Sequence, residues 1–162
     1  MTGLWHPLGT GGGGGSLPLL AVRDVKSTAS DGGASGANTW NWRTLNTVDT
    51  NEIADASLAS NQISLPAGDY EIEARAPAYG TGRHRLRLYN QTAGTTLLNG
   101  QNNYASGGGG STAHLSGRFT LGATSTLRLH HFTELAVATI GLGVGNAGGV
   151  QSVFADVRIR QR

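Results

Sequence analysis

Three groups of side chains in this sequence have types and spacings that could support chemistry. They are the pair His130 and His131 with Glu134, the alternate carboxylates Glu71 and Glu73, and the alternate guanidinium groups Arg83, Arg85 and Arg87. Histidine with a carboxylate can ligate a metal ion, and two carboxylates can hydrolyse a glycosidic bond. A row of guanidinium groups can bind carboxylates or phosphates through paired hydrogen bonds. Each possibility depends on which side chains share a face.

The histidine pair lacks the spacing of a metal site. Two ligands on one strand are two residues apart so that both point to the same face, whereas adjacent residues point to opposite faces. His130 and His131 are adjacent, and Glu134 shares a face with His130 only if the strand continues without distortion. We therefore predict no metal and no cofactor, and we interpret His131 as a histidine at the edge of the core.

The carboxylate pair is weak evidence for catalysis. On a strand, Glu71 and Glu73 would share a face about 7 Å apart, a separation compatible with glycosidase pairs. Every strand with alternating glutamates shows the same separation, however. The sequence has no Gly-x-Ser-x-Gly nucleophile motif, and its glycine runs lack the lysine of a phosphate-binding loop. We predict that the protein is not an enzyme.

The composition favours a folded β protein with many turns. The 162 residues include 26 glycines, and only 14% are charged. There is no cysteine, which excludes disulfides and thiolate metal sites. The net charge of +2 is too dilute to indicate nucleic-acid binding. No segment approaches the roughly 20 apolar residues of a membrane-spanning helix, so we expect neither a nucleic-acid partner nor membrane insertion.

The clearest strand signal is the alternation of apolar and charged residues between positions 63 and 90. Alternation of this kind is typical of half-buried antiparallel strands. The side chains expected to face the core are Tyr70, Ile72, Ala74, Ala76, His84, Leu86 and Leu88. Weaker signals predict strands at 17–27, 39–48, 95–101, 113–121, 126–134, 138–144 and 152–160, with a loop at 51–60. About nine or ten short strands at this spacing indicate a sandwich or jelly roll.

The first 16 residues have a different character from the rest of the chain. Trp5, His6 and Pro7 precede the run GTGGGGGS. Because a glycine run is a flexible linker, we predict that residues 1–16 form a tether with a docking peptide at its tip, the alternative being a disordered tail. Residues 17–162 are then the jelly-roll domain.

The segments LPAGDYEIEARA, RHRLRLYN and SVFADVRIRQR resemble the trimeric jelly-roll domains of the complement and tumour-necrosis-factor superfamily. LPAGDYEIEARAPAY, RLYNQTAGTTLLNG and LSGRFTL are similar to domains at the ends of phage tail or head fibre proteins, including those of phage-like gene transfer agents. The resemblance covers about 63–162. It implies an all-β jelly-roll sandwich of about ten antiparallel strands, with tumour-necrosis-factor-like topology, assembled as a homotrimer.

The resemblance also implies how neighbouring strands are arranged. Locally, 69–76 and 83–90 could pair as a hairpin, but in the jelly-roll topology they lie in opposite sheets and form an arch. The strand 69–76 would then neighbour the C-terminal strand and the strand around Arg128. A self-complementary trimer interface is expected on their outward faces, formed by Glu71, Glu73, Arg128, His130, Phe132, Phe154, Arg158 and Arg160. The alternative is a solvated face with ion pairs worth at most about 1 kcal/mol each.

The opposite sheet would carry a basic outward face. Its predicted ligand-binding residues are Arg83, Arg85, Arg87, Arg118 and His114, with Tyr104 from a nearby loop. Such a face could hold an anionic sugar, a carboxylated polysaccharide or a phosphate. The alternative is an ordinary solvated basic surface.

These expectations together predict a fibre or spike protein on the surface of a phage or phage-like particle. It would be made in the host cytoplasm without a signal peptide, and it would dock through its N-terminus on a capsid or tail protein. Three copies would attach to a host-surface glycan by binding without turnover, since linked sites raise the effective concentration. The alternatives are a structural decoration or adaptor protein that binds no receptor, and a glycan-active enzyme.

Overall fold

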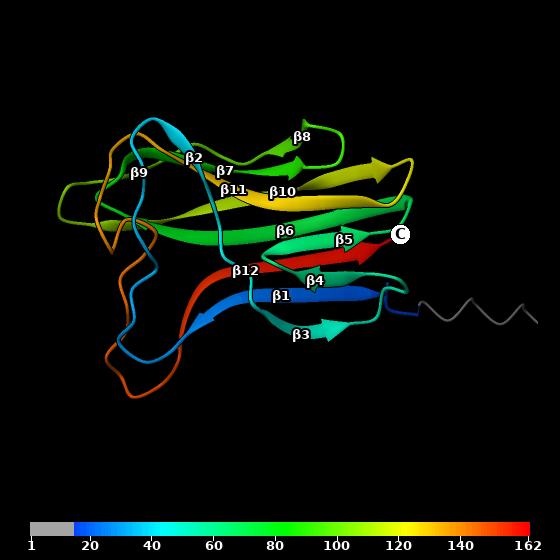
Figure 1. Cartoon of the computed structure of the whole chain (residues 1–162), viewed down its shortest axis with the longest axis horizontal. Helices are drawn as coiled ribbons and strands as arrows, with labels where there is room; N and C mark the ends of the chain where they lie inside the picture. Colours follow the sequence, from blue (N-terminus) through cyan, green and yellow to red (C-terminus); the bar gives the residue numbers. More distant parts are fainter. Residues whose placement is uncertain (1–14) are drawn as a thin grey trace, which may run out of the picture.

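The computed structural model describes residues 15–162 as two antiparallel sheets packed face to face (Figure 1). The first, called the β6 sheet, contains β1 (Leu19–Lys26), β3 (Thr47–Asn51), β6 (Gly68–Tyr79), β10 (Gly110–Leu121) and β12 (Ser152–Gln161). The second, called the β7 sheet, contains β2 (Thr39–Trp42), β4 (Ser57–Ala59), β5 (Gln62–Leu65), β7 (Gly82–Asn90), β8 (Thr95–Asn99), β9 (Asn103–Ala105) and β11 (Ser125–Thr133). The predicted docking residues Trp5, His6 and Pro7 lie outside the described residues.

The strand order of each sheet sets which side chains are neighbours. The β6 sheet runs β10-β6-β12-β1-β3. The β7 sheet runs β4-β5-β11-β7-β8, with β2 also paired to β11 and β9 to β7. Residues 15–162 contain no helix long and apolar enough to cross a membrane. The predicted all-β class and antiparallel pairing are confirmed.

The core forms where the inward side chains of the two sheets meet. Successive side chains of a strand point to opposite faces, so each strand contributes alternate residues. Tyr70 of β6 stacks on Phe119 of β10 with ring centroids 5.4 Å apart. The apolar residues Tyr70, Ile72, Leu86, Leu88, Phe119 and Val157 belong to one buried cluster. The predicted inward faces of β6 and β7 are therefore correct.

Consecutive strands β6 and β7 lie in different sheets, which confirms the arch and excludes the hairpin. Gly80 in the connection and Gly82 at the start of β7 have φ of 65° and 69°, a backbone region that favours glycine. A Cβ at Gly82 would lie 2.6 Å from Oε2 of Glu134. Glycine at this position therefore lets the chain cross between the sheets while passing close to the end of β11.

Two predicted strands differ from the structure. The predicted strand 39–48 is two strands, β2 and β3, in different sheets, because the chain passes from one sheet to the other over 43–46, where the Arg43 side chain is buried. The predicted strand 138–144 is a loop that packs on the end of the sandwich, with Leu142 buried. Its apolar residues and glycines resemble a strand locally, but they serve close contact between loops. The predicted loop 51–60 contains the short strand β4.

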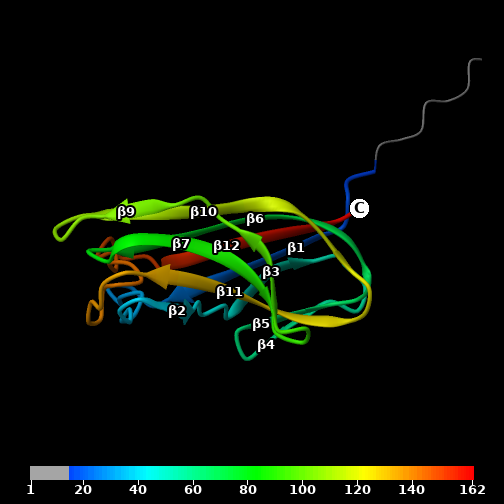
Figure 2. The same cartoon turned by 90° about the horizontal axis from the view of Figure 1, so that it is seen from above.

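The two ends of the sandwich differ. β1 begins and β12 ends at one end, where the backbone N–H of Gln161 donates to the carbonyl of Pro18 at 3.0 Å. The connections 27–38, 106–109 and 134–151 gather at the opposite end (Figures 1 and 2). We call these the terminal end and the loop end.

Candidate functional site

The predicted basic set is divided between the two sheets. β10 pairs with β6, so Arg118 and His114 face outward from the β6 sheet and lie away from the arginines of β7. Arg118 lies opposite Glu71, with its Nε 3.6 Å from Oε2 of that carboxylate. The predicted grouping of these two residues with Arg83, Arg85 and Arg87 is therefore wrong.

The predicted interface set is divided as well. Arg128, His130 and Phe132 lie on β11, which pairs with β7 and not with β6. Phe154 points outward from β12 but is buried, since Gly143 packs on it so closely that a Cβ there would lie 2.7 Å from the ring. Phe154 is thus covered by the chain itself. The members that remain together on the β6 sheet are Glu71, Glu73, Arg158 and Arg160.

Charge is distributed unequally between the sheets. The strands of the β7 sheet contain no Asp or Glu, and their basic residues are Arg83, Arg85, Arg87 and Arg128. The strands of the β6 sheet contain six acidic residues, Asp24, Asp49, Asp69, Glu71, Glu73 and Asp156, and six basic ones, Arg23, Lys26, Arg75, Arg118, Arg158 and Arg160. The β7 sheet therefore has the composition of an anion-binding face, and the β6 sheet has a balanced one.

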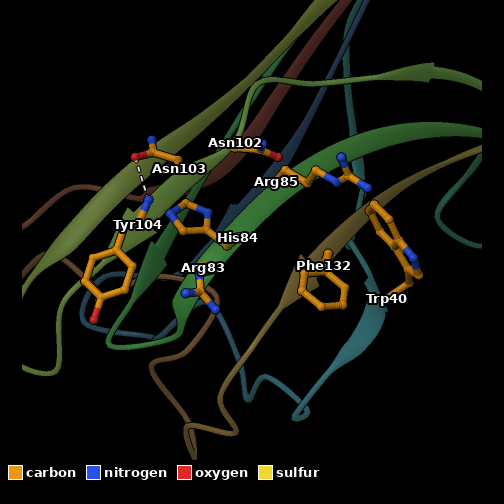
Figure 3. A pocket seen from close by; sticks show the side chains of 8 residues that line it. All are labelled: Trp40, Arg83, His84, Arg85, Asn102, Asn103, Tyr104 and Phe132. Carbon is orange, nitrogen blue, oxygen red and sulfur yellow. Dashed lines mark hydrogen bonds between the residues drawn. The ribbon is translucent and has the colours of Figure 1, made fainter.

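A cleft of about 660 Å³ opens on the outward side of the β7 sheet (Figure 3). We call it the arginine–aromatic cleft. Its lining residues are Trp40, Arg83, His84, Arg85, Asn102, Asn103, Tyr104 and Phe132. β9, which supplies Tyr104, lies at the loop end (Figure 1). The cleft brings together three of the predicted ligand-binding residues: Arg83, Arg85 and Tyr104.

One wall of the cleft combines aromatic rings with a guanidinium group. Strand pairing sets Phe132 of β11 between Trp40 of β2 and Arg85 of β7. The rings of Trp40 and Phe132 meet edge to face with centroids 5.5 Å apart. The Arg85 guanidinium carbon lies 5.7 Å from the Trp40 ring centroid. This wall therefore offers both an apolar surface and a positive charge.

The two cleft arginines differ in their ion pairing. Nη1 of Arg83 lies 2.8 Å from Oε1 of Glu134, whose other oxygen accepts the backbone N–H of Arg83. Among residues 15–162, Arg85 has no carboxylate within ion-pair distance. Arg85 is therefore the guanidinium group best able to take a carboxylate from a ligand.

The opposite wall is built from β9 and the preceding loop. Tyr104 is 61% exposed, and its ring lies across the cleft from Trp40 (Figure 3). Asn103 supports this wall, because its amide donates to the carbonyl of Thr112 at 2.7 Å and its Oδ1 accepts the backbone N–H of Tyr104. The wall thus presents an exposed ring held by a fixed backbone.

A buried hydrogen-bond chain supports the cleft from inside. Nδ1 of His84 lies 2.9 Å from Nε2 of His131, and Nε2 of His84 lies 2.7 Å from Oγ of Ser111. Ser111 donates its single hydroxyl hydrogen to the carbonyl of Tyr104 at 2.9 Å. His84 must then donate to Ser111 and accept from His131. The serine is not activated as a nucleophile in this arrangement; it ties β9 to the core.

Arg87 stabilises the aromatic wall and does not line the cleft. Its guanidinium carbon lies 4.1 Å from the Trp40 ring centroid and 4.6 Å from that of Tyr89. Its Nε and Nη2 lie 3.2 and 3.0 Å from Nδ1 of His130. Burial and the adjacent Arg87 and Arg128 lower the pKa of His130 to about 4. His130 is therefore neutral at physiological pH and accepts the hydrogen bonds of Arg87.

We expect the protein to lose stability as the pH falls from about 6.5 to about 4. Burial lowers the pKa of His84. Burial, with Arg43 and His84 nearby, lowers the pKa of His131. Burial, with Arg87 and Arg128 nearby, lowers that of His130. The unfolded chain then binds protons that the folded chain does not, so the stability present above the unfolded pKa is lost as the pH falls. His130 alone should account for on the order of 2 kcal/mol.

Urea unfolding at pH 7 and pH 4.5 measures this dependence. His130→Asn retains an acceptor for Arg87 and should reduce the loss between the two pH values. His114→Asn, at an exposed position on β10, is the matched control and should leave the loss unchanged. Equal stability of the original protein at both pH values would contradict the assignment of neutral buried histidines.

Five of the cleft residues were not predicted from the sequence as ligand-binding: Trp40, His84, Asn102, Asn103 and Phe132. The position of Trp40 and Trp42 on one face was a usable signal, because two exposed-face tryptophans indicate a binding surface. The asparagines precede and begin a very short strand, and no local pattern distinguishes them from ordinary loop residues.

Comparison with known proteins rests on structure, because no protein-family model and no curated protein matches the chain. Murine APRIL is 9% identical with a TM-score of 0.58, over 89% of this chain and 98% of that one. The globular domain of zebrafish complement 1qA protein is 15% identical with a TM-score of 0.57, over 90% and 96%. The PRD1 vertex protein P5 is 17% identical with a TM-score of 0.54, over 91% and 99%. At these identities the similarity concerns the fold, and the chain has the predicted jelly-roll fold of the complement and tumour-necrosis-factor type.

Proposed function

We propose that this protein is a surface spike of a phage or phage-like particle, and that it attaches the particle to a host cell by binding an acidic polysaccharide in the arginine–aromatic cleft. The observation that carries this proposal is the charge distribution: the face that contains the cleft is basic and free of acidic strand residues. The structural similarity to a protein named for a particle vertex supports the particle surface as the location.

The chemistry of the cleft suits a sugar that bears a carboxylate. Arg85 would take the carboxylate through two parallel hydrogen bonds, which match the planar guanidinium group. The apolar face of a sugar ring would pack on Trp40 or Tyr104, which supply large rigid surfaces at low entropic cost. Asn102 and Asn103 offer amide groups to hydroxyls. Together these groups meet the usual pattern of a concave site with a few polar contacts.

The position of the cleft fits attachment. The chain enters the sandwich at the terminal end, so a preceding tether would hold that end toward the particle. The cleft wall on β9 lies at the loop end (Figure 1). A ligand on a cell surface could therefore reach the cleft while the protein remains anchored.

The arrangement of the side chains favours binding without turnover over catalysis. Ser111 directs its hydroxyl hydrogen to a backbone carbonyl, and Glu134 is engaged by Arg83. Glu71 is engaged by Arg118 and Arg162 on the other sheet. Glycoside hydrolysis requires two carboxyl groups beside the scissile bond, one acting as an acid or base. None of these groups lies in the cleft in such an arrangement.

We test the proposal with an array of bacterial capsular polysaccharides, with carboxyl-reduced forms of each as the matched control. The protein should bind one or more carboxylated glycans and lose that binding when the carboxyls are reduced. Release of reducing ends would favour a glycan-active enzyme. A protein that decorates the particle without a receptor would bind no glycan on the array, which would refute the proposal.

Three copies are proposed to associate through the outward face of the β6 sheet. Its charges are matched: Glu73 lies opposite Arg158, and Nη1 of Arg162 lies 2.9 Å from Glu71. Toward the loop end, Val153 is 49% exposed and lines a shallow groove with neighbouring residues of β6 and β10. Matched charges beside exposed apolar groups suit a self-complementary interface.

The association is tested by sedimentation equilibrium at micromolar protein. We expect the mass of a trimer. Glu73→Arg should yield monomer, because it removes the carboxylate that balances Arg158 on this face, and the excess positive charge of neighbouring copies would then meet across the interface at a cost of several kcal/mol. Ser64→Arg places an arginine on the outward face of the β7 sheet and should leave the mass unchanged. A monomeric original protein would contradict the proposed interface.

A further inference from the structure

Trp42 is an exposed aromatic residue outside the arginine–aromatic cleft. The residue is 62% exposed, and it lies two residues from Trp40 on the same face of β2, about 7 Å away by strand rise. An exposed tryptophan leaves a large apolar surface in water, which is unfavourable unless a ligand covers it.

The ring of Trp42 is held in place by its neighbours. The guanidinium carbon of Arg128 lies 3.8 Å from its centroid. The Trp42 ring also stacks on the ring of His130, with an interplanar angle of 20° and centroids 6.4 Å apart. His130 in turn stacks on Tyr89 at 19° and 4.9 Å. A ring fixed in this way is a rigid surface that loses little conformational entropy when it binds.

The surroundings of Trp42 are positive and incompletely satisfied. Arg128 forms no ion pair with another described residue, and its buried Nε has no hydrogen-bond partner. The strands around it contain no acidic residue. An anionic ligand would therefore meet a charge that the protein itself does not neutralise.

The two tryptophans are joined by a continuous row of side chains. Arg87 lies over Trp40 and donates to His130, which stacks on Trp42. This row runs from the wall of the cleft across β7, β11 and β2. The strands that carry this row contain no Asp or Glu, so an acidic ligand that extends from Trp40 toward Trp42 meets no like charge on them.

We infer that Trp42 and Arg128 form a second subsite for the same acidic polysaccharide, so that the protein recognises an extended chain segment and not a single terminal sugar. This inference rests on the proposed function. One sugar unit occupies the cleft between Trp40 and Tyr104, and a later unit of the chain packs on Trp42 with its carboxylate at Arg128.

The test uses the acidic polysaccharide that binds best on the array, cut into oligosaccharides of increasing length. Titration calorimetry should give affinities that rise with length until both subsites are filled and then level off. Trp42→Ala should lower the affinity for the longest oligosaccharide about tenfold, the loss of one aromatic contact. It should leave the affinity for the shortest binding oligosaccharide within about twofold. Trp42→Phe should restore most of the loss.

The outcomes separate this inference from the proposed function. If affinity is independent of length, or if Trp42→Ala acts equally at every length, the second subsite is refuted while the cleft stands. If no acidic glycan binds at all, both are refuted. If Trp42→Ala instead changes the sedimentation mass, a second copy of the chain covers Trp42 and the subsite is refuted. Val48→Ala, at an exposed position on β3 of the other sheet, should leave the affinity unchanged at every oligosaccharide length.

Discussion

Replacing Arg43 with methionine should reduce the free energy of unfolding by about 3–5 kcal/mol. The Arg43 side chain is fully buried, and its guanidinium group donates to the carbonyls of Leu142 and Phe154 and more weakly to that of Pro77. Methionine fills a similar volume but leaves these buried carbonyls without the guanidinium donor. Each unpaired carbonyl then carries a desolvation penalty that no hydrogen bond offsets.

The charge of Arg43 adds to this effect. Burial lowers its pKa to about 10, so it remains protonated at neutral pH. Burial raises the pKa of Asp24, and the positive charges of Lys26 and Arg43 act in the opposite direction by lowering it. Removing Arg43 takes away one of the two positive charges that favour the ionised form of the buried Asp24 carboxylate, and Lys26 stays at 4.0 Å from it. A buried carboxylate with one nearby cation in place of two is costlier to keep ionised, which adds to the destabilisation.

Urea unfolding at pH 7 measures the loss, with Arg118→Met as the matched control. Arg118 is exposed on β10, and its pair with Glu71 is a surface ion pair, so the control should cost less than about 1 kcal/mol. An Arg43→Met protein as stable as the original would show that Arg43 does not hold the 134–151 loop against the sandwich.

Replacing Arg85 with glutamine should lower the affinity for an acidic oligosaccharide by about 10- to 100-fold. Hydrogen bonds to charged groups contribute roughly 1.5–3 kcal/mol, and about 1.4 kcal/mol corresponds to a factor of ten. Arg85 is expected to carry this effect because Arg83 is already paired with Glu134 and Arg87 packs behind Trp40.

Titration calorimetry with the best array ligand gives the affinity. Arg118→Gln is the matched control, because the sequence alone groups Arg118 with Arg85 while strand pairing sets it on the opposite sheet. It should bind as the original does. If Arg118→Gln weakens binding as strongly as Arg85→Gln, the ligand does not bind in the cleft. If both variants bind normally, carboxylate recognition by Arg85 is wrong.

The sequence is sufficient to predict the strands and their faces where one side is buried. Tyr70 and Ile72, and Leu86 and Leu88, alternate with charged residues, and this pattern alone fixes which side faces the core. The pattern fails for residues 138–144, where apolar residues and glycines pack a loop against Phe154 and Pro77. Close loop packing and a buried strand need the same residue types, so local composition does not separate them.

The composition of the candidate site could be predicted only in part. Both wrong groupings have one origin: the strands that carry Arg118 and Arg128 were expected beside β7 and β6 respectively, whereas β10 pairs with β6 and β11 with β7. Alternation specifies the face of a side chain but not the neighbour of its strand. Strand order depends on contacts between distant segments, and so do the cleft and the segregation of charge between the sheets.

The most direct test of attachment through the β7 sheet is the rate at which particles adsorb to their host cells. Particles that carry Arg85→Gln should contain the same amount of this protein as the original particles. Their rate of adsorption should be lower by a factor of about ten or more. Particles that carry Arg118→Gln should adsorb at the original rate. Equal adsorption by particles with the original protein, with Arg85→Gln and with no copy of the protein would contradict a role in host attachment.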